Sequence, residues 1–148
     1  MDDQAFMKFA LDEAARGLSE GGVPVGAALV ADEKVLGAGH NRRVQQDSAT
    51  RHGETDCLEN IGRLPASVYR RSTMYTTLSP CDMCTGAILL YGIPRVVIGE
   101  NETFMGGEDY LRSRGVEVVN LDSADCKALM AEFIERYPDV WNEDIGEE

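Results

Sequence analysis

A stretch of β-forming residues runs straight into a helix start that carries two cysteines, and this junction constrains the fold more than any other feature. Residues 73–78 are typical of a strand. Ser79 and Pro80 follow as a good N-cap and a good first helical residue. Cys81 and Cys84 lie three positions apart at that helix start, so both thiols face the same side. The junction therefore predicts a strand–helix unit with a pair of sulfur atoms at its turn.

The rest of the chain alternates between helical and extended patterns. Apolar residues at helical spacing between positions 6 and 18 predict an N-terminal helix, and the apolar run 23–30 predicts a buried strand. The other expected elements are a hairpin strand over 34–39, helices over 50–62, 79–91, 107–113 and 122–137, and strands over 95–99 and 117–121. The connection between the last two strands is long enough for a parallel crossover. This order predicts an α/β fold in a single domain of 148 residues, with one sheet covered by helices.

The net charge and the cysteines indicate which binding partners and which cellular compartment to expect. The chain has 14 basic and 26 acidic residues, a net charge of -12. Proteins that bind nucleic acids or anionic membranes draw affinity from Lys and Arg, so neither partner is expected, whereas a small neutral substrate is compatible. The first residues lack a signal-peptide pattern, and no apolar run approaches the ~18 residues of a membrane span. We therefore expect a reducing, cytoplasmic setting, in which neighbouring cysteines indicate metal or redox chemistry.

A histidine and a glutamate near the start of an earlier helix complete a candidate metal site. The partial positive charge of a helix N-terminus favours thiolates, which are good zinc ligands. His52 offers a third ligand, and a zinc ion with three protein ligands keeps a fourth position for water. Zinc makes hydroxide available from that water near neutral pH. Glu54, two residues from His52, is then free to act as a general acid and base rather than as a ligand.

Other interpretations of these residues remain open. The two neighbouring cysteines also fit a thioredoxin-like redox pair. A closed structural zinc site is a second possibility, with Cys57, Cys126 or His40 as the fourth ligand. On a regular helix His52 and Glu54 would point apart, so both can serve one site only if His52 lies at the very start of the helix.

The full pattern resembles a known family. His-Gly-Glu at 52–54, followed by Pro-Cys-Asp-Met-Cys at 80–84, is the signature of zinc-dependent nucleobase deaminases. Further collinear segments are Gly-Gly-Val-Pro at 21–24, Gly-His-Asn at 39–41, Ser-Ala-Thr at 48–50, Tyr-Gly-Ile-Pro-Arg at 91–95, Gly-Glu-Asn at 99–101 and Glu-Asp-Ile-Gly at 143–146. With these segments the chain is similar to the fungal-type cytosine deaminases of the cytidine deaminase superfamily along its whole length. The resemblance implies a three-layer α/β/α fold with a mixed five-stranded sheet, a cytoplasmic homodimer, and one Zn²⁺ per chain.

The resemblance also implies a reaction and residue roles that local sequence does not indicate. The reaction is the conversion of cytosine to uracil and ammonia, with attack by a zinc-bound hydroxide and Glu54 as the proton shuttle. The implied metal ligands are His52, Cys81 and Cys84. Asn41 would bind the pyrimidine carbonyl and ring N–H, and Asp144 would hold the departing amino group. The remaining residues implied for the substrate site are Gly53, Ser79, Val25, Phe104 and Trp141. Residues 138–148 would form a C-terminal lid that includes Trp141.

One departure from the family keeps other substrates open. Asp56 follows the His-Gly-Glu motif where the fungal enzymes are less acidic. It is either a solvated helix residue or one that alters the pocket or a dimer contact, and the second case would admit isocytosine or a related amino-heterocycle. Two rival functions share the zinc pattern. They are a tRNA adenosine deaminase, which the acidic charge argues against, and a non-catalytic zinc-stabilised module, which would leave Glu54 unused.

Overall fold

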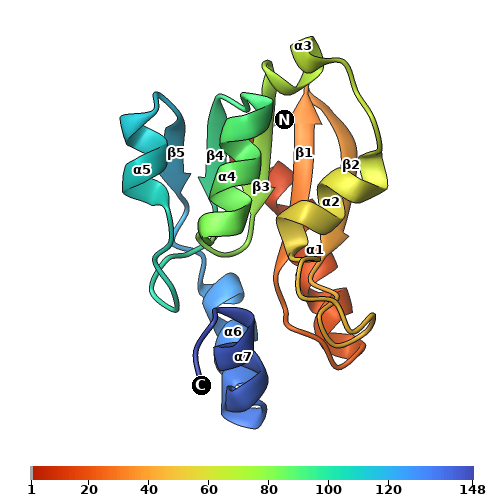
Figure 1. Ribbon diagram of the computed structural model, residues 1–148, viewed down its shortest axis with the longest axis vertical. Helices are drawn as coiled ribbons and strands as arrows, with labels where there is room; N and C mark the ends of the chain where they lie inside the picture. Colours follow the sequence, from red (N-terminus) through yellow and green to blue (C-terminus); the bar gives the residue numbers. More distant parts are fainter. Residues whose placement is uncertain (1) are drawn as a thin grey trace.

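Five strands form one mixed sheet in the computed structural model, which describes residues 2–148 (Figure 1). The order across the sheet is β2-β1-β3-β4-β5. The strands are β1 Gly26–Ala31, β2 Lys34–His40, β3 Ser72–Thr76, β4 Arg95–Ile98 and β5 Glu117–Asn120. β1 pairs antiparallel with β2 and β3, whereas β3, β4 and β5 run parallel. The mixed sheet and the parallel crossover into the last strand are therefore confirmed.

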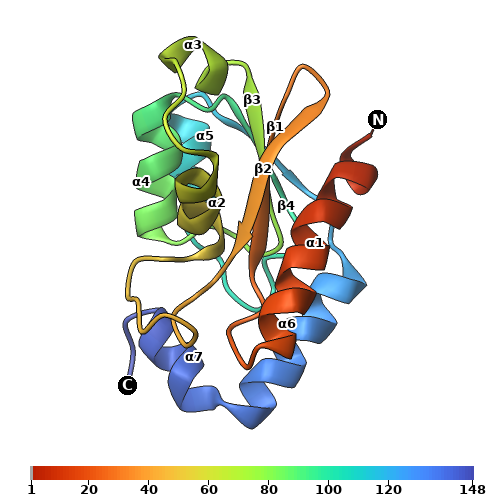
Figure 2. The ribbon, with the colours of Figure 1, turned by 90° about the vertical axis from the view of Figure 1, so that its right-hand side faces the viewer.

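Helices cover both faces of this sheet, which confirms the three-layer α/β/α architecture (Figure 2). One face carries α1 Asp3–Ser19 and α6 Ala124–Arg136, and the other carries α2 Gly53–Ile61, α4 Asp82–Tyr91 and α5 Glu108–Ser113. The short helices α3 Ala66–Tyr69 and α7 Pro138–Asp144 have no counterpart among the expected elements. No helix within residues 2–148 combines the length and apolar character needed to cross a bilayer.

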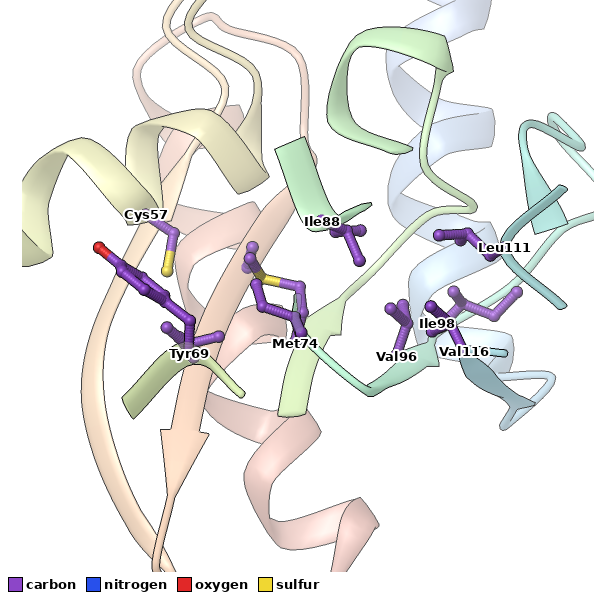
Figure 3. Packing of buried hydrophobic residues seen from close by; sticks show 11 residues of the cluster. Cys57, Tyr69, Met74, Ile88, Val96, Ile98, Leu111 and Val116 are labelled. Atoms are coloured by element: carbon purple, nitrogen blue, oxygen red, sulfur yellow. The ribbon is translucent and has the colours of Figure 1, made fainter. Parts of the chain in front are cut away.

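The larger core lies between the sheet and the layer of α2, α4 and α5 (Figure 3). Met74 and Val96 project from neighbouring strands toward Ile88 and Leu111 of the covering helices, and all four side chains are buried. Burial of such a side chain stabilises the fold by about 1.5–3 kcal/mol. All six residues of β1 are buried, as expected for a central strand with helices on both sides.

On the opposite face, α1 packs against β1, β3 and β4. Phe6, Ala10 and Ala14, which helical spacing predicts to face the core, are buried, whereas Phe9, predicted by the same spacing, is 42% exposed and Met7 is buried instead. Phe6 packs against Tyr75 at a centroid distance of 5.5 Å. The turn between β1 and β2 uses Asp32 and Glu33 with positive φ angles of 53° and 60°, as in a two-residue hairpin turn.

Two helix starts lie further along the chain than the sequence predicts. The N-cap of α4 is Cys81 rather than Ser79, because the Ser79 hydroxyl instead donates a 2.6 Å hydrogen bond to the buried carboxylate of Glu108. Likewise Ser123, not Asp122, caps α6, and its hydroxyl accepts a hydrogen bond from the Cys126 N–H. Both shifts move the first helical residue by one or two positions without changing which helix forms.

Candidate active site

His52 is the N-cap of α2, with extended backbone angles of φ -77° and ψ 173°. Its backbone N–H donates a 2.9 Å hydrogen bond to the Thr55 hydroxyl, which fixes the helix start. Because His52 precedes the first helical residue, its ring can turn toward α4 while Glu54 points inward from the first turn. The condition that the sequence left open, a histidine at the very start of the helix, is therefore met.

The imidazole of His52 meets both thiols of the Cys-x-x-Cys motif. Its Nδ1 lies 3.4 Å from Cys81 Sγ and 3.9 Å from Cys84 Sγ. The three candidate ligand atoms all lie within 4.8 Å of one another. A tetrahedral zinc ion, with bonds of about 2.3 Å to sulfur and about 2.0 Å to nitrogen, would hold nitrogen and sulfur about 3.5 Å apart. The donor set and its spacing therefore fit zinc.

The candidates for a fourth protein ligand lie elsewhere. The Cys57 thiol contacts the carbonyl of Gly37 at 3.6 Å, and the His40 ring lies between Glu13 and Glu20. Within residues 2–148 the metal-binding group contains one histidine and two cysteines only. This arrangement is the one expected of a catalytic rather than a closed structural site.

The pKa values of the two thiols and the imidazole are shifted in different directions. A hydrogen bond from the Cys84 thiol and another with His52 lower the pKa of Cys81 to about 4. The same hydrogen bond between the two cysteines, together with burial, raises the pKa of Cys84 well above its usual range. Burial disfavours a charged His52, but hydrogen bonds with Asp144 and Cys81 outweigh it and raise the pKa of the imidazole to about 10. The site is thus built around a thiolate, the form of cysteine that binds metal ions.

Glu54 lies beside this group in the first turn of α2 and is 3% exposed. Burial, followed by the nearby negative charge of Cys81, raises the pKa of its carboxyl group to about 7. A carboxyl group with a pKa near neutrality can both release and recover a proton under physiological conditions. The sequence predicted this residue as a general acid and base, and its environment has the properties that such a role requires.

Two of the candidate ligands, His52 and Cys81, line a small pocket together with Glu54; its volume of about 20 Å³ has room for about one water molecule. The lining residues are Val25, Asn41, His52, Glu54, Leu78, Ser79, Cys81, Phe104, Trp141, Asp144 and Ile145. Six of the seven predicted substrate-site residues are thus brought together. The seventh, Gly53, is buried behind the pocket against Val25, where an added Cβ would lie 2.9 Å from the Val25 carbonyl oxygen.

Two lining residues were not anticipated. Leu78 follows β3, and Ile145 follows the last residue of α7. Leu78 is the last apolar residue before the Ser-Pro-Cys junction, which is the one signal that could have identified it. Ile145 could have been suspected only as an isolated apolar residue in an acidic tail.

Two aromatic side chains that line the pocket pack against each other. The rings of Phe104 and Trp141 meet edge to face, with centroids 6.2 Å apart and an interplanar angle of 85°. Trp141 is 7% exposed because it packs with Phe133 and Met130 of α6. A wider hollow of about 490 Å³ adjoins the pocket and shares His52, Cys81, Phe104, Asp144 and Ile145 with it.

Asp144 ties the C-terminal helix to the site. Its carboxylate accepts hydrogen bonds from Asn41 Nδ2 at 3.0 Å and from Arg43 Nε at 2.6 Å, and it lies 3.2 Å from His52 Nε2. Arg43 also donates to Glu143 at 2.8 Å. Sequence reasoning missed Arg43, because nothing in the chain indicates that position 43 meets residues one hundred positions later.

Asp56, the departure from the family pattern, is neither solvated nor part of the pocket. Its side chain has an exposed fraction of 0% and is ion-paired with Arg42 and Arg51. It is absent from the residues that line the pocket. The expectation of a solvated helix residue is therefore wrong, and the expected change to the pocket wall does not arise.

The site geometry agrees with comparisons to known proteins. Residues 1–100 match the family model described as the cytidine and deoxycytidylate deaminase zinc-binding region. A cytosine deaminase of Candida albicans is 56% identical over 147 residues, covering 99% of this chain and 98% of that protein. A tRNA-specific adenosine deaminase of Streptococcus pyogenes is 34% identical over 139 residues, covering 86% and 87% of the two chains.

The fold leads to the same family. A solved structure of a tRNA:A34 deaminase superposes with a TM-score of 0.71 at 26% identity, covering 85% of this chain and 99% of that one. The sequence and the fold of the chain thus point to the same group of enzymes. This chain belongs to the cytidine and deoxycytidylate deaminase family of zinc-binding enzymes.

Proposed function

We propose that this enzyme is a cytosine deaminase, which replaces the exocyclic amino group of cytosine with oxygen and releases uracil and ammonia. The observation that carries this proposal is the convergence of His52, Cys81 and Cys84 beside a buried Glu54, with His52, Cys81 and Glu54 lining one pocket. The Candida albicans relative, which matches nearly the whole chain at 56% identity, supports cytosine as the substrate.

His52, Cys81 and Cys84 would hold one Zn²⁺ per chain. The separations of 3.4 and 3.9 Å between the imidazole nitrogen and the two sulfurs support this assignment. When bound, zinc supplies Lewis-acid activation of water near neutral pH. A cation would also favour ionisation of the Cys84 thiol, whose pKa is raised in the protein alone.

Glu54 moves the protons in this mechanism. Its carboxylate accepts a proton from the attacking water and transfers it to ring nitrogen N3 of cytosine. Once the oxygen is bonded to C4, the carboxylate takes the remaining proton of that hydroxyl group and passes it to the amino group. The C4–N bond then breaks, ammonia leaves, and the C4 carbonyl of uracil forms. Protonation of N3 withdraws electrons from C4 and makes that carbon more susceptible to attack. Burial, which raises the pKa of Glu54 to about 7, supports this use of one group in both directions.

Asn41 has the hydrogen-bonding capacity that the base requires. Its side-chain oxygen accepts from the Arg43 backbone N–H at 2.9 Å, and its side-chain nitrogen donates to Asp144 at 3.0 Å. These contacts fix the orientation of the amide and leave one donor hydrogen and one acceptor lone pair free. Cytosine presents the complementary pair, a carbonyl oxygen at C2 and an N–H at N1.

The other lining residues enclose the base and receive its amino group. Asp144 retains acceptor capacity for the departing amine, next to the candidate metal ligand His52. Val25 would pack beneath the ring, with Phe104 and Trp141 above it. Ser79, whose hydroxyl is held by Glu108, would line the pocket just before α4, and Gly53 would allow the start of α2 to pack closely against Val25. Residues 138–148 act as a lid in this proposal, because they supply both Trp141 and Asp144.

The cellular setting and assembly are part of the same proposal. All four cysteines are unpaired, which supports a cytoplasmic setting. A homodimer is supported by the apolar surface of α4, where Leu90 is 75% exposed and Tyr91 41% exposed beside a groove that extends to Leu58 of α2.

A substrate panel tests this function directly. Purified protein is incubated with cytosine, isocytosine, cytidine and adenosine, and ammonia and zinc are measured on the same sample. We expect rapid ammonia release from cytosine, at one zinc per chain. Turnover of isocytosine but not of cytosine would replace the proposed base. Stoichiometric zinc with no ammonia from any compound would favour a non-catalytic zinc module, and a shift of tRNA on a gel would favour the editing enzymes.

A further inference from the structure

The loop between β2 and α2 carries a proposed site residue at each end. Asn41 begins this loop and His52 ends it, and both line the pocket. The loop is closed at its base by a 2.9 Å hydrogen bond from the Arg42 N–H to the Arg51 carbonyl. Arg42, which follows Asn41, and Arg51, which precedes His52, therefore lie side by side. Contacts that hold these two arginines in place also set the distance from Asn41 to His52.

The buried carboxylate of Asp56 accepts hydrogen bonds from both of these arginines. Asp56 Oδ1 accepts from Arg42 Nε at 3.0 Å and from Arg51 Nε at 2.8 Å. Asp56 Oδ2 accepts from the His40 N–H at 3.0 Å and from the Asn60 side chain at 3.2 Å. One side chain of α2 thus holds the last residue of β2, the start of the loop and the end of the loop.

The surroundings of Asp56 keep it charged and close to the strand. Burial alone would raise the pKa of this carboxyl group, but hydrogen bonds from the His40 N–H and the two arginines outweigh it and hold the pKa below its usual value. Gly39 allows the close approach of β2, because a Cβ there would lie 2.7 Å from Asp56 Oδ2 and 2.5 Å from the Cys57 nitrogen. The Arg42 and Arg51 side chains are 24% and 29% exposed, so the ion pairs are partly shielded from water.

We propose that Asp56 is a positioning residue for this reaction: its carboxylate clamps Arg42 and Arg51 and thereby sets the spacing between the base-binding amide of Asn41 and the imidazole of His52. This inference rests on the proposed function, since it assigns those two residues to base and metal. In this proposal the position of His52 depends on two carboxylates. Asp56 fixes the backbone at the end of the loop, and Asp144 contacts the far nitrogen of the ring.

The variant Asp56→Asn tests the clamp. The asparagine keeps the size of the side chain but removes its charge and one acceptor site. Residues that support metal ligands from behind typically contribute 10–100-fold to activity or metal affinity, so we expect kcat to fall by about that factor. The affinity for Zn²⁺, measured by competition with a chelator, should fall as well. Amide hydrogen exchange of residues 41–52 should accelerate, a change that a loss of general stability would spread over the whole chain.

Two further sets of variants make the result specific. In Arg42→Gln and Arg51→Gln, one cation remains to neutralise Asp56, so these chains should fold even if Asp56→Asn does not. If both arginines act through Asp56, the losses in kcat will be strongly non-additive when either is combined with Asp56→Asn. Asp32→Asn is the matched control, since it breaks an exposed pair between Asp32 and Arg71 on the far hairpin.

The outcomes separate this inference from the proposed function. Additive losses, or unchanged exchange and zinc affinity in Asp56→Asn, would overturn the positioning role. If the unmodified chain released no ammonia from cytosine, the proposed function would fail. Loop exchange and zinc affinity would in that case still decide whether Asp56 organises the metal end of the loop.

Discussion

The two halves of the pocket are held in different ways. The half that carries His52, Glu54 and the two cysteines is built from the starts of α2 and α4, which lie against the central strands of the sheet. The other half, with Trp141 and Asp144, comes from the seven-residue helix α7 near the end of the chain. It is attached by an apolar contact with α6 and by hydrogen bonds of Asn41 and Arg43 to the carboxylate of Asp144. The candidate metal ligands and Glu54 thus belong to the body of the protein, whereas Trp141 and Asp144 belong to a short element attached to it at the end of the chain.

The two largest effects are expected from Glu54→Gln and from loss of the lid, and Glu54→Gln alters the core half without touching a ligand. Turnover should fall by about 10²–10⁴-fold or more, because general acid–base catalysis is lost at more than one step. Zinc content should stay at one per chain, since the amide replaces the carboxyl without disturbing His52 or the cysteines. Ammonia release and zinc are measured on the same preparation. Glu135→Gln, at an exposed position of α6, is the matched control. Full turnover in Glu54→Gln would show that the two halves are not divided as described.

Deletion of residues 138–148 tests the lid half by itself. We expect turnover to be abolished and zinc to be retained, because the metal group lies entirely in the body of the protein. The shortened chain should melt at a lower temperature, since Phe133 and Leu78 lose their packing against Trp141. Circular dichroism and zinc analysis check the fold. A control that lacks only residues 147 and 148 keeps Ile145 and should stay active. An active longer truncation would remove the lid from the mechanism.

The smallest of these effects is expected from Arg43→Gln. Arg43 is 15% exposed in its side chain and donates to Asp144, so its loss loosens α7 without removing a group that touches the base. A hydrogen bond to a charged group is worth about 1.5–3 kcal/mol, which corresponds to a rise in KM of about tenfold or more. Steady-state kinetics with cytosine provide the measurement. Glu143→Gln, which removes only the outer partner of Arg43, should change KM little. Equal effects of the two substitutions would mean that the outer ion pair holds the helix.

The same division explains what could be predicted from the sequence. The two cysteines are encoded locally, since a strand followed by Pro-Cys-x-x-Cys specifies both the helix start and the side on which the sulfurs lie, whereas their meeting with His52 depends on the fold. The register of that start was less predictable. Ser79 is a good capping residue, but a tertiary contact with Glu108 takes its hydroxyl and shifts the N-cap to Cys81.

The position of residues 138–148 beside the pocket could not be derived from the local sequence pattern. Nothing near Asp144 indicates that it returns to Asn41 and Arg43, and only the family resemblance assigned it to the pocket. The expectation that Asp56 is solvated was wrong for a related reason. An acidic residue on a helix is usually solvated, and its burial here depends on two arginines that meet it from opposite ends of a loop.

The pocket and the wider hollow beside it have lining residues in common, which has a consequence for the timing of the reaction. His52, Cys81, Phe104, Asp144 and Ile145 line both spaces. We therefore expect cytosine to arrive, and uracil to leave, through the hollow and past Phe104 and Ile145. This exchange competes with bond making as the slow event, and a burst of uracil in the first turnover would reveal which of the two limits the rate.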